Sequence, residues 1–150
     1  MQEMRAALYA RVACASQQTK HAIVSQLEVL RDYAASRGMK VIEEFTDEGH
    51  SGLRLDRPGL DRMRGLAERR GVDVLLTCGP DRLARSVALQ VLVIEEMERC
   101  GVKTIFRDGG PADEPLSMLR EVTVAVAELE PLKVIERDRH SKAMGLAARR

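Results

Sequence analysis

The chain has 150 residues, 45% of them hydrophobic, which suits one compact domain with a core of its own. It contains no Trp, two Tyr and two Phe, and this scarcity of aromatic rings argues against stacking on single-stranded nucleic acid and against a carbohydrate platform. No stretch approaches the roughly 18 uncharged apolar residues that a membrane span needs, and the N-terminus lacks a signal-peptide profile. We therefore expect a cytoplasmic protein with no membrane partner.

Basic residues are concentrated at the C-terminal end of the chain. The net charge is +1, but residues 133–150 hold six basic side chains and two acidic ones, so this segment carries +4 and the remainder −3. A polyanion would therefore meet one local basic surface rather than a basic protein. The residues of this surface are Lys133, Arg137, Arg139, Lys142, Arg149 and Arg150. A solvated helix without a binding role is the alternative explanation.

The cysteines and histidines show no spacing typical of a metal site. Cys14, Cys78 and Cys100 are far apart, with no Cys-x-x-Cys pair and no His at ligand spacing, and the three histidines are equally scattered. This pattern predicts free thiols, histidines at the surface or in packing, and no metal or small-molecule cofactor.

The first part of the chain predicts two strands with a helix between them. Residues 6–12 form a short apolar run typical of a strand, and the polar stretch 14–21 has no period and predicts a loop. From Ala22 to Ala34 apolar residues recur at helical steps, and Gly38 stands where a helix commonly ends. Residues 40–46 alternate as a second strand, and the glycine-containing stretch 47–58 predicts a loop.

The same alternation continues through the middle of the chain. Pro58 opens a second helix, and residues 72–77 form the apolar run of a buried central strand. After a break at Gly79 and Pro80, residues 89–100 predict a further helix and residues 102–106 a fourth strand. This order predicts a three-layer α/β/α domain with a mainly parallel sheet of four to five strands. In such folds the ligand chemistry lies at the carboxyl ends of the strands.

The last segment, from about residue 115, predicts one long C-terminal helix. Its apolar stripe consists of Leu119, Val122, Val126 and Leu129. Pro131 costs about 3 kcal/mol in a helix interior, so we expect a kink or break near residues 127–131. No internal repeat or linker marks a second domain, and residues 1–150 are expected to form a single one.

Arginine is prominent in three charged sets that follow predicted strands. Arg11 ends the first strand, Arg57 lies in the second set, and Arg82 and Arg85 follow the third strand. In a helical turn Arg82 and Arg85 would project to one side, and Asp81 would be placed to pair with Arg85. A guanidinium binds two phosphate oxygens at once and stays charged, so the pattern favours a phosphate site. Ordinary surface ion pairs are the alternative.

Together these motifs resemble the serine site-specific recombinase family, which includes resolvases, invertases and large serine integrases. The resemblance extends over essentially the whole chain. The matching residues are Tyr9, Arg11, Val12 and Gln17; Asp47, Ser51 and Gly52; Asp56, Arg57 and Pro58; Asp81 to Ser86; and Ala127, Glu128, Glu130, Glu136 and Arg137. Three positions depart from the family pattern: Ala13 replaces the nucleophilic serine, Pro80 a leucine and Pro131 a basic residue.

The resemblance implies a metal-free reaction in which a serine hydroxyl attacks a DNA phosphodiester and forms a phosphoserine linkage. It implies that Arg11, Arg57, Arg82 and Arg85 stabilise the charge at phosphorus, and that Asp81 holds an arginine in place. It also implies a supporting set, namely Tyr9, Gln17, Asp47, Ser51 and Arg137. The general acid and base are left unassigned.

Ala13 predicts the loss of strand cleavage, because a methyl group cannot attack phosphorus. Ser16 lies too far along the loop to replace the serine, and the side chain of Cys14 should point away from that of Ala13. Two explanations remain open: a deliberate serine-to-alanine replacement, or a natural inactive relative. The intact arginines and Gln17 favour the first.

The resemblance further implies double-stranded DNA as the partner, a homodimer that forms a tetramer on synapsis, and a DNA-binding domain outside residues 1–150. The main alternative is a naturally inactive DNA-binding or dimerisation module of the same fold. A nucleotide-binding domain of the same class should have a glycine-rich loop after the first strand, and residues 13–20 contain no glycine.

Overall fold

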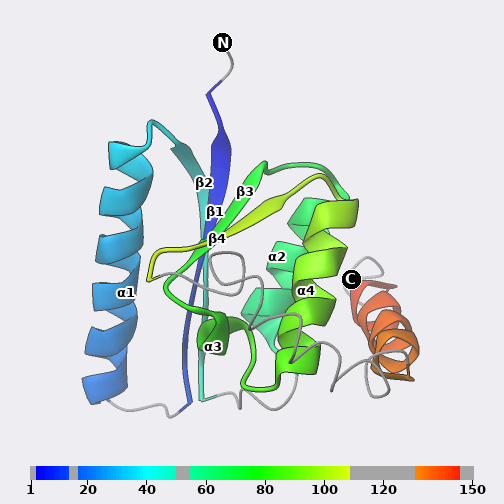
Figure 1. Cartoon of the computed structure of the whole chain (residues 1–150). Coiled ribbons are helices and arrows are strands. Elements are labelled where there is room, and N and C mark those ends of the chain that lie inside the picture. The colour runs from blue at the N-terminus through cyan, green and yellow to red at the C-terminus, as the bar shows by residue number, and fades with distance from the viewer. Residues whose placement is uncertain (1–2, 14–16, 50–54, 109–130, 146–150) are drawn as a thin grey trace.

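The computed structural model describes residues 3–13, 17–49, 55–108 and 131–145, and in these residues strands and helices alternate (Figure 1). The strands are β1 (Arg5–Val12), β2 (Lys40–Glu48), β3 (Val74–Thr77) and β4 (Lys103–Phe106). The helices are α1 (Gln17–Ser36), α2 (Pro58–Glu68), α3 (Pro80–Leu83) and α4 (Val87–Arg99), and residues 131–145 are also helical. The predicted α/β class is therefore confirmed.

The four strands form one sheet in the order β2-β1-β3-β4, and every neighbouring pair is parallel. β1 and β3 occupy the interior of the sheet, and all four residues of β3 are buried, as predicted for a central strand. Because the strands are parallel, their carboxyl ends lie along one edge of the sheet. The predicted arginines follow the strands at that edge.

Helices cover both faces of the sheet, which gives the predicted three layers. α1 lies on one face and α2 and α4 on the other (Figure 1). Alternate residues of β1 point to opposite faces, because successive side chains of a strand alternate. The residues Ala6, Leu8, Ala10 and Val12 pack with α1, whereas Ala7 and Tyr9 pack in the core cluster that contains α2 and α4.

The helix ends confirm most of the predicted boundaries. Gly38, after α1, and Gly101, after α4, have φ angles of +67° and +76°, the left-handed conformation that glycine adopts without strain. α1 begins at Gln17, so the prediction of a loop through residue 21 was wrong. Lys20 and His21 are exposed, and this turn therefore gives no apolar periodicity from which a helix could be predicted.

Several predictions concern residues outside the described ranges. The apolar stripe of residues 119–129, most of the proposed kink at residues 127–131, and Cys14 lie there. Pro131 itself is helical and exposed. Cys78 and Cys100 are free thiols, as predicted. Within the described ranges, no helix is both long and apolar enough to cross a membrane.

Candidate active site at the carboxyl edge of the sheet

The strand register brings three of the predicted site residues to one face of the sheet. Tyr9 pairs with Phe45 across β1 and β2, and Arg11 pairs with Asp47 two residues further on. Tyr9 and Phe45 belong to the core cluster on the α2 side, so Arg11 and Asp47, each two residues along its strand, emerge on the same side. Asp47 belongs to β2 rather than to the predicted loop.

The Asp47 carboxylate holds the N-terminus of α2. It is 3% exposed and accepts hydrogen bonds from the backbone N–H groups of Gly59 at 2.7 Å and Leu60 at 2.9 Å. A carboxylate satisfies the free N–H groups at a helix start and is stabilised by the helix dipole. Gly59 leaves the necessary space, since a Cβ there would lie 2.5 Å from the carbonyl oxygen of Thr46 and 2.9 Å from Asp47 Oδ2.

Tyr9 links this carboxylate to Arg57. The fully buried Tyr9 hydroxyl donates to Asp47 Oδ2 at 2.7 Å and accepts from Arg57 Nη1 at 2.9 Å. Burial is the largest cause of the raised pKa of Tyr9; the charge of Arg57 opposes the shift, whereas Asp47 adds to it. The phenol therefore stays neutral and donates a hydrogen bond to the carboxylate.

Arg11 and Arg57 are buried and reach the backbone of the short helix α3. Arg11 is 3% exposed and Arg57 fully buried. Arg11 donates to the carbonyl oxygens of Asp81 at 2.7 Å and Arg82 at 3.1 Å, and Arg57 donates to those of Arg82 and Leu83. A helix as short as α3 leaves the carbonyl groups of its last residues without helical donors, and the two arginines satisfy them.

Four guanidinium groups lie close enough to influence one another here. The pKa of Arg11 is lowered, first by its burial and then by the positive charge of Arg57, with smaller contributions of the same sign from Arg82 and Arg85; Tyr9 opposes the shift. A lowered pKa means that positive charge is disfavoured at this place. An anion bound among these groups would relieve the repulsion, as required of a site that stabilises developing negative charge.

Part of the predicted arrangement around α3 was wrong. α3 ends at Leu83, and Ala84 is extended, so Arg82 and Arg85 are not on one side of a helical turn. Asp81 therefore lacks the helical step toward Arg85, and its carboxylate lies 3.9 Å from Nε of Arg82 instead. Arg82 donates from Nη1 to the carbonyl oxygen of Arg11 at 3.1 Å, which ties α3 back to β1.

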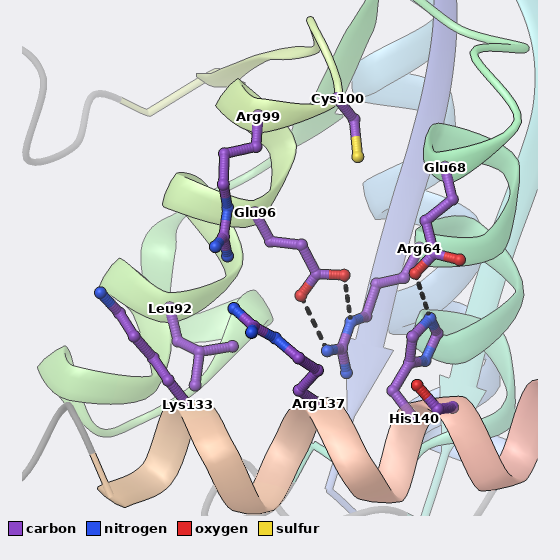
Figure 2. Close-up of a pocket in the computed structure, with 10 residues that line it drawn as sticks. Arg64, Glu68, Leu92, Glu96, Arg99, Cys100, Lys133, Arg137 and His140 are labelled. Carbon is purple, nitrogen blue, oxygen red and sulfur yellow. Dashed lines mark hydrogen bonds and ion pairs between the residues drawn. The ribbon is translucent and has the colours of Figure 1, made fainter.

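The structure shows no polar side-chain contact with this site for the other predicted residues whose side chains it describes. Ala13 is exposed and follows β1 directly, two residues beyond Arg11. Gln17 is the first residue of α1, whereas Ser51 lies outside the described ranges. Arg137 was predicted to support the active site, but it lines a pocket between α2, α4 and residues 131–145 together with Glu96 and Arg99 (Figure 2).

The predicted basic surface of the C-terminal segment contains lysines in ion pairs with nearby carboxylates and an arginine that faces the domain. Lys133 forms an ion pair with Glu95 at 2.8 Å, and Lys142 one with Asp138 at 3.0 Å that is exposed on both sides. Arg139 faces the domain rather than the solvent: its Nη2 lies 2.8 Å from Asp61 Oδ1. Arg149 and Arg150 lie outside the described ranges. A role in DNA binding stays a prediction for all of these residues.

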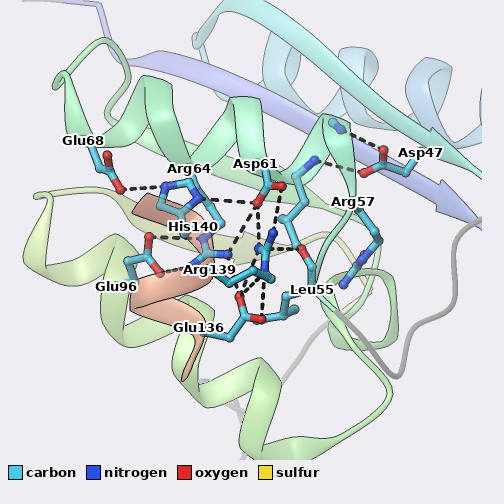
Figure 3. A network of polar contacts seen from close by, with 12 residues as sticks. Asp47, Leu55, Arg57, Asp61, Arg64, Glu68, Glu96, Glu136, Arg139 and His140 are labelled. Carbon is cyan, nitrogen blue, oxygen red and sulfur yellow. Dashed lines mark hydrogen bonds and ion pairs between the residues drawn. The ribbon is translucent and has the colours of Figure 1, made fainter. Parts of the chain in front are cut away.

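A partly buried ionic network was not predicted at all, and Figure 3 shows its members. Arg64 of α2 is 1% exposed and donates to both carboxylate oxygens of Glu96 at 3.1 and 2.8 Å, and to Glu136 at 3.2 Å. His140 completes the network through Asp61 and Glu68. We name this set, Asp61, Arg64, Glu68, Glu96, Glu136, Arg139 and His140, the docking cluster.

One signal in the sequence could have revealed the α2 part of the docking cluster. Asp61, Arg64 and Glu68 recur at three- and four-residue steps, each one position after the core residues Leu60, Met63 and Ala67. Three charges that follow the apolar stripe so regularly lie at its border, where a further element can cover them. Their partners on α4 and on residues 131–145 could not be assigned from spacing.

Comparison with known proteins places the fold and sequence in one family. The model of the family "Resolvase, N terminal domain" matches residues 6–149. The chain is 35% identical over 136 residues to the transposon Tn3 resolvase of Escherichia coli. This match covers 89% of the chain and 68% of the resolvase. The chain is 33% identical over 133 residues to a DNA recombinase candidate of Bacillus subtilis (strain 168), of whose length it spans 26%.

Solved structures agree with the sequence relatives. The N-terminal catalytic domain of TP901-1 integrase superposes with a TM-score of 0.71 at 25% identity, over 84% of this chain and 97% of that one. The C-terminal catalytic domain of ISC1926 TnpA, an IS607-like serine recombinase, superposes with a TM-score of 0.64 at 29% identity, over 95% and 99%. The chain belongs to the resolvase N-terminal domain family, the catalytic-domain family of the serine recombinases.

Proposed function

We propose that this domain binds a DNA phosphodiester at the carboxyl edge of its sheet and is the catalytic domain of a site-specific recombinase. The observation that carries the proposal is the convergence of Arg11, Arg57 and Arg82 at α3, on the carboxyl edge of the sheet. The lowered pKa of Arg11, caused first by burial and then by the neighbouring guanidinium groups, agrees with it. Such a concentration of positive charge beside an exposed strand end suits a phosphate that gains negative charge during a reaction.

The proposed reaction needs a serine hydroxyl at position 13. Its oxygen would form a bond to phosphorus, the bond from phosphorus to the 3′ oxygen would break, and the 3′ hydroxyl would leave with a proton. The phosphoserine ester conserves the bond energy for rejoining the exchanged strands. Ala13 has no hydroxyl, so the chain as it stands should bind DNA without cleaving it.

We assign different roles to the exposed and the buried residues of this site. Arg82 has a side chain 35% exposed, and Arg85 is exposed, so both can contact a phosphate directly. The buried Arg11 and Arg57 would hold α3 in place and add positive charge on the protein side of the bound phosphate. Tyr9 and Asp47 would position Arg57.

The behaviour of the whole protein belongs to the same proposal. We assign it double-stranded DNA as a substrate, a dimer in the resting state, a tetramer on synapsis and a cytoplasmic location. The names of its relatives, a transposon resolvase and an IS607-like serine recombinase, support DNA rearrangement as the setting. Its basic C-terminal residues would supply DNA affinity that falls as salt rises.

The test compares the unchanged chain with its Ala13→Ser variant, each linked to a DNA-binding region and supplied with a crossover site that traps the covalent intermediate. We expect a covalent protein–DNA adduct only for Ala13→Ser. Ala35→Ser is the matched control, because Ala35 is an exposed alanine in the last turn of α1 and is not one of the proposed site residues. If Ala13→Ser binds DNA equally well without forming an adduct, the second candidate, an inactive DNA-binding module, takes its place; Ala13 itself favours that candidate.

A further inference from the structure

The pocket between α2, α4 and residues 131–145 has an excess of positive side chains (Figure 2). Its volume is about 210 Å³. The charged side chains of its lining, apart from the imidazole of His140, are Arg64, Glu68, Glu96, Arg99, Lys133 and Arg137. A hollow lined mainly by one sign of charge concentrates ions of the opposite sign. The lining therefore favours an anion over a cation.

The two carboxylates of the lining already have contacts within it. Both oxygens of Glu96 accept hydrogen bonds from the buried Arg64, at 3.1 and 2.8 Å. Oε1 of Glu68 lies 2.8 Å from Nε2 of His140. Because these contacts bind both carboxylates to other lining residues, an incoming anion would face mainly the three remaining cations, Arg99, Lys133 and Arg137.

Arg99 and Arg137 face the same part of the pocket from two different helices. Figure 2 shows their side chains directed toward one another beside Leu92, one from α4 and one from residues 131–145. Both residues are exposed, and neither guanidinium forms a hydrogen bond or an ion pair with the residues that the structure describes. Two guanidinium groups that face one space repel each other unless an anion lies between them.

Lys133 adds a third cation to the same side of the pocket. It lies one helical turn before Arg137, and residues four apart share one face of a helix. Its ammonium group lies 2.8 Å from Glu95 Oε2 on α4, which holds it at the pocket. An ammonium group has three N–H donors, so this ion pair leaves it able to donate to a second partner.

We propose that Arg99, Lys133 and Arg137 bind a small phosphate-class anion, either inorganic phosphate or the phosphate group of a small molecule. A guanidinium binds two phosphate oxygens at once, and a lysine binds phosphate as a point charge. The tetrahedral group has four oxygens and can therefore accept from donors on both sides of the pocket. A planar carboxylate has two oxygens, which one arginine alone can occupy.

The charges beside the pocket favour a small anion over a DNA backbone. Exposed carboxylates adjoin the lining residues in the sequence, since Glu98 precedes Arg99 and Asp138 follows Arg137. The side chain of Glu95 is also 42% exposed. A long polyanion would meet these negative groups next to the pocket, whereas a small anion inside it would contact the cations alone.

The position of Arg99 has a simpler explanation, which covers only part of the observations. Arg99 lies in the last turn of α4, where a positive charge is favoured by the helix dipole. This effect does not account for Arg137 and Lys133, which approach from residues 131–145. An anion held by all three residues would join α4 to this segment. Its binding does not depend on the proposed recombinase reaction, and the test requires no DNA cleavage.

The experiment titrates the unchanged chain with inorganic phosphate at constant ionic strength and follows thermal unfolding. We expect a saturable rise in Tm of about 3–6 °C when phosphate is roughly 10-fold above its Kd. Phosphate also stabilises proteins generally, because it is excluded from their surfaces, and this effect is common to all variants. Arg99→Gln and Arg137→Gln should each abolish the saturable part. Both residues are exposed, so the fold should tolerate the changes.

Two controls separate this site from other effects of phosphate and from DNA binding. Arg62→Gln removes an exposed arginine of α2 outside the lining and should keep the saturable rise. A short DNA duplex at the same phosphate concentration should not reproduce the rise that depends on Arg99. The proposal is overturned if Arg99→Gln and Arg62→Gln respond equally to phosphate. It is also overturned if the duplex gives the Arg99-dependent rise and inorganic phosphate gives none.

Discussion

Two arginine-rich regions of this domain have opposite electrostatic character. At the carboxyl edge of the sheet the pKa of Arg11 is lowered, by burial first and by the nearby guanidinium groups next. In the docking cluster the pKa of Arg139 is raised, because its hydrogen bonds to Asp61 and Glu136 and their charges outweigh the opposing effect of burial. The first region disfavours its own positive charge, and the second stabilises it.

The difference follows from what the guanidinium groups contact. The hydrogen bonds described for Arg11 and Arg57 end on backbone carbonyl oxygens and on the Tyr9 hydroxyl, which carry no net charge. Those of Arg64 and Arg139 end mainly on carboxylates. Arg64 and Arg139 therefore join helices through opposite charges, whereas the described contacts of Arg11 and Arg57 join neighbouring elements to α3 through uncharged oxygens.

The largest expected effect on stability comes from the docking cluster. Replacing Arg64 by methionine would leave the partly buried carboxylate of Glu96 without this partner and the buried carboxylate of Glu136 with Arg139 alone. We expect Arg64→Met to lower the free energy of unfolding by about 3–5 kcal/mol, measured by urea denaturation. Arg62→Met, at an exposed position of the same helix, should change it by less than about 0.5 kcal/mol. Equal effects of the two substitutions would contradict the role assigned to Arg64.

The opposite behaviour is expected at the carboxyl edge. In a chain that also carries Ala13→Ser, Arg82→Ala should reduce the rate of DNA cleavage by about 100- to 1,000-fold. Stability should change by only about 1 kcal/mol, since one hydrogen bond to the carbonyl of Arg11 is lost. Arg107→Ala, an exposed arginine directly after β4, is the control for general charge loss. A cleavage rate unaffected by Arg82→Ala would remove this residue from the proposed site.

Acid should weaken the docking cluster through Asp61. Its pKa is about 2 in the folded protein against an ordinary value of 3.8, so it contributes stability that is fully present above pH 4. This contribution, about 2 kcal/mol, should be lost as the pH falls from about 4 to 2. When the free energy of unfolding is measured by urea denaturation at several pH values in that range, it should fall less steeply with pH for Asp61→Asn than for the unchanged chain. An unchanged slope would mean that other carboxylates dominate the acid response.

The smallest expected effect lies between the two regions, at the start of α4. The Ser86 hydroxyl accepts a hydrogen bond from the Leu89 N–H at 3.5 Å and caps the helix. Because this contact is long, Ser86→Ala should cost about 0.5–1 kcal/mol in thermal or urea unfolding. Ser86→Asp, which can still cap the helix, should recover most of the loss. Failure to recover it would assign the effect to packing rather than to the cap.

The sequence predicted the parts of this domain that local chemistry determines. Strand runs, apolar helix periods and the glycines after α1 and α4 are local signals, and the structure confirms the elements derived from them. Arg11, Asp47 and Arg57 were assigned to one site by resemblance, and parallel strands bring such residues to one edge. The register of Tyr9 and the carbonyl contacts of α3 depend on the three-dimensional packing and have no signal in the sequence.

The docking cluster could not be predicted, because its contacts depend on packing between distant elements. Arg64 and Glu96 are 32 residues apart, and His140 and Asp61 are 79 apart. No spacing rule relates such residues, and separately each resembles a solvated charge on a helix. The error at Arg82 and Arg85 has the opposite origin, since a helical rule was applied beyond the end of α3 at Leu83.

The placement of α2 gives the two regions a common mechanical element. Arg57 lies at its N-terminal boundary, Asp47 binds its first N–H groups, and Arg64 and Glu68 lie along its later turns. An 11-residue helix is about 16 Å long and moves essentially as a rod. A movement of α2 along its axis that breaks its contacts with residues 131–145 would therefore also act on Arg57 and Asp47 at the other end.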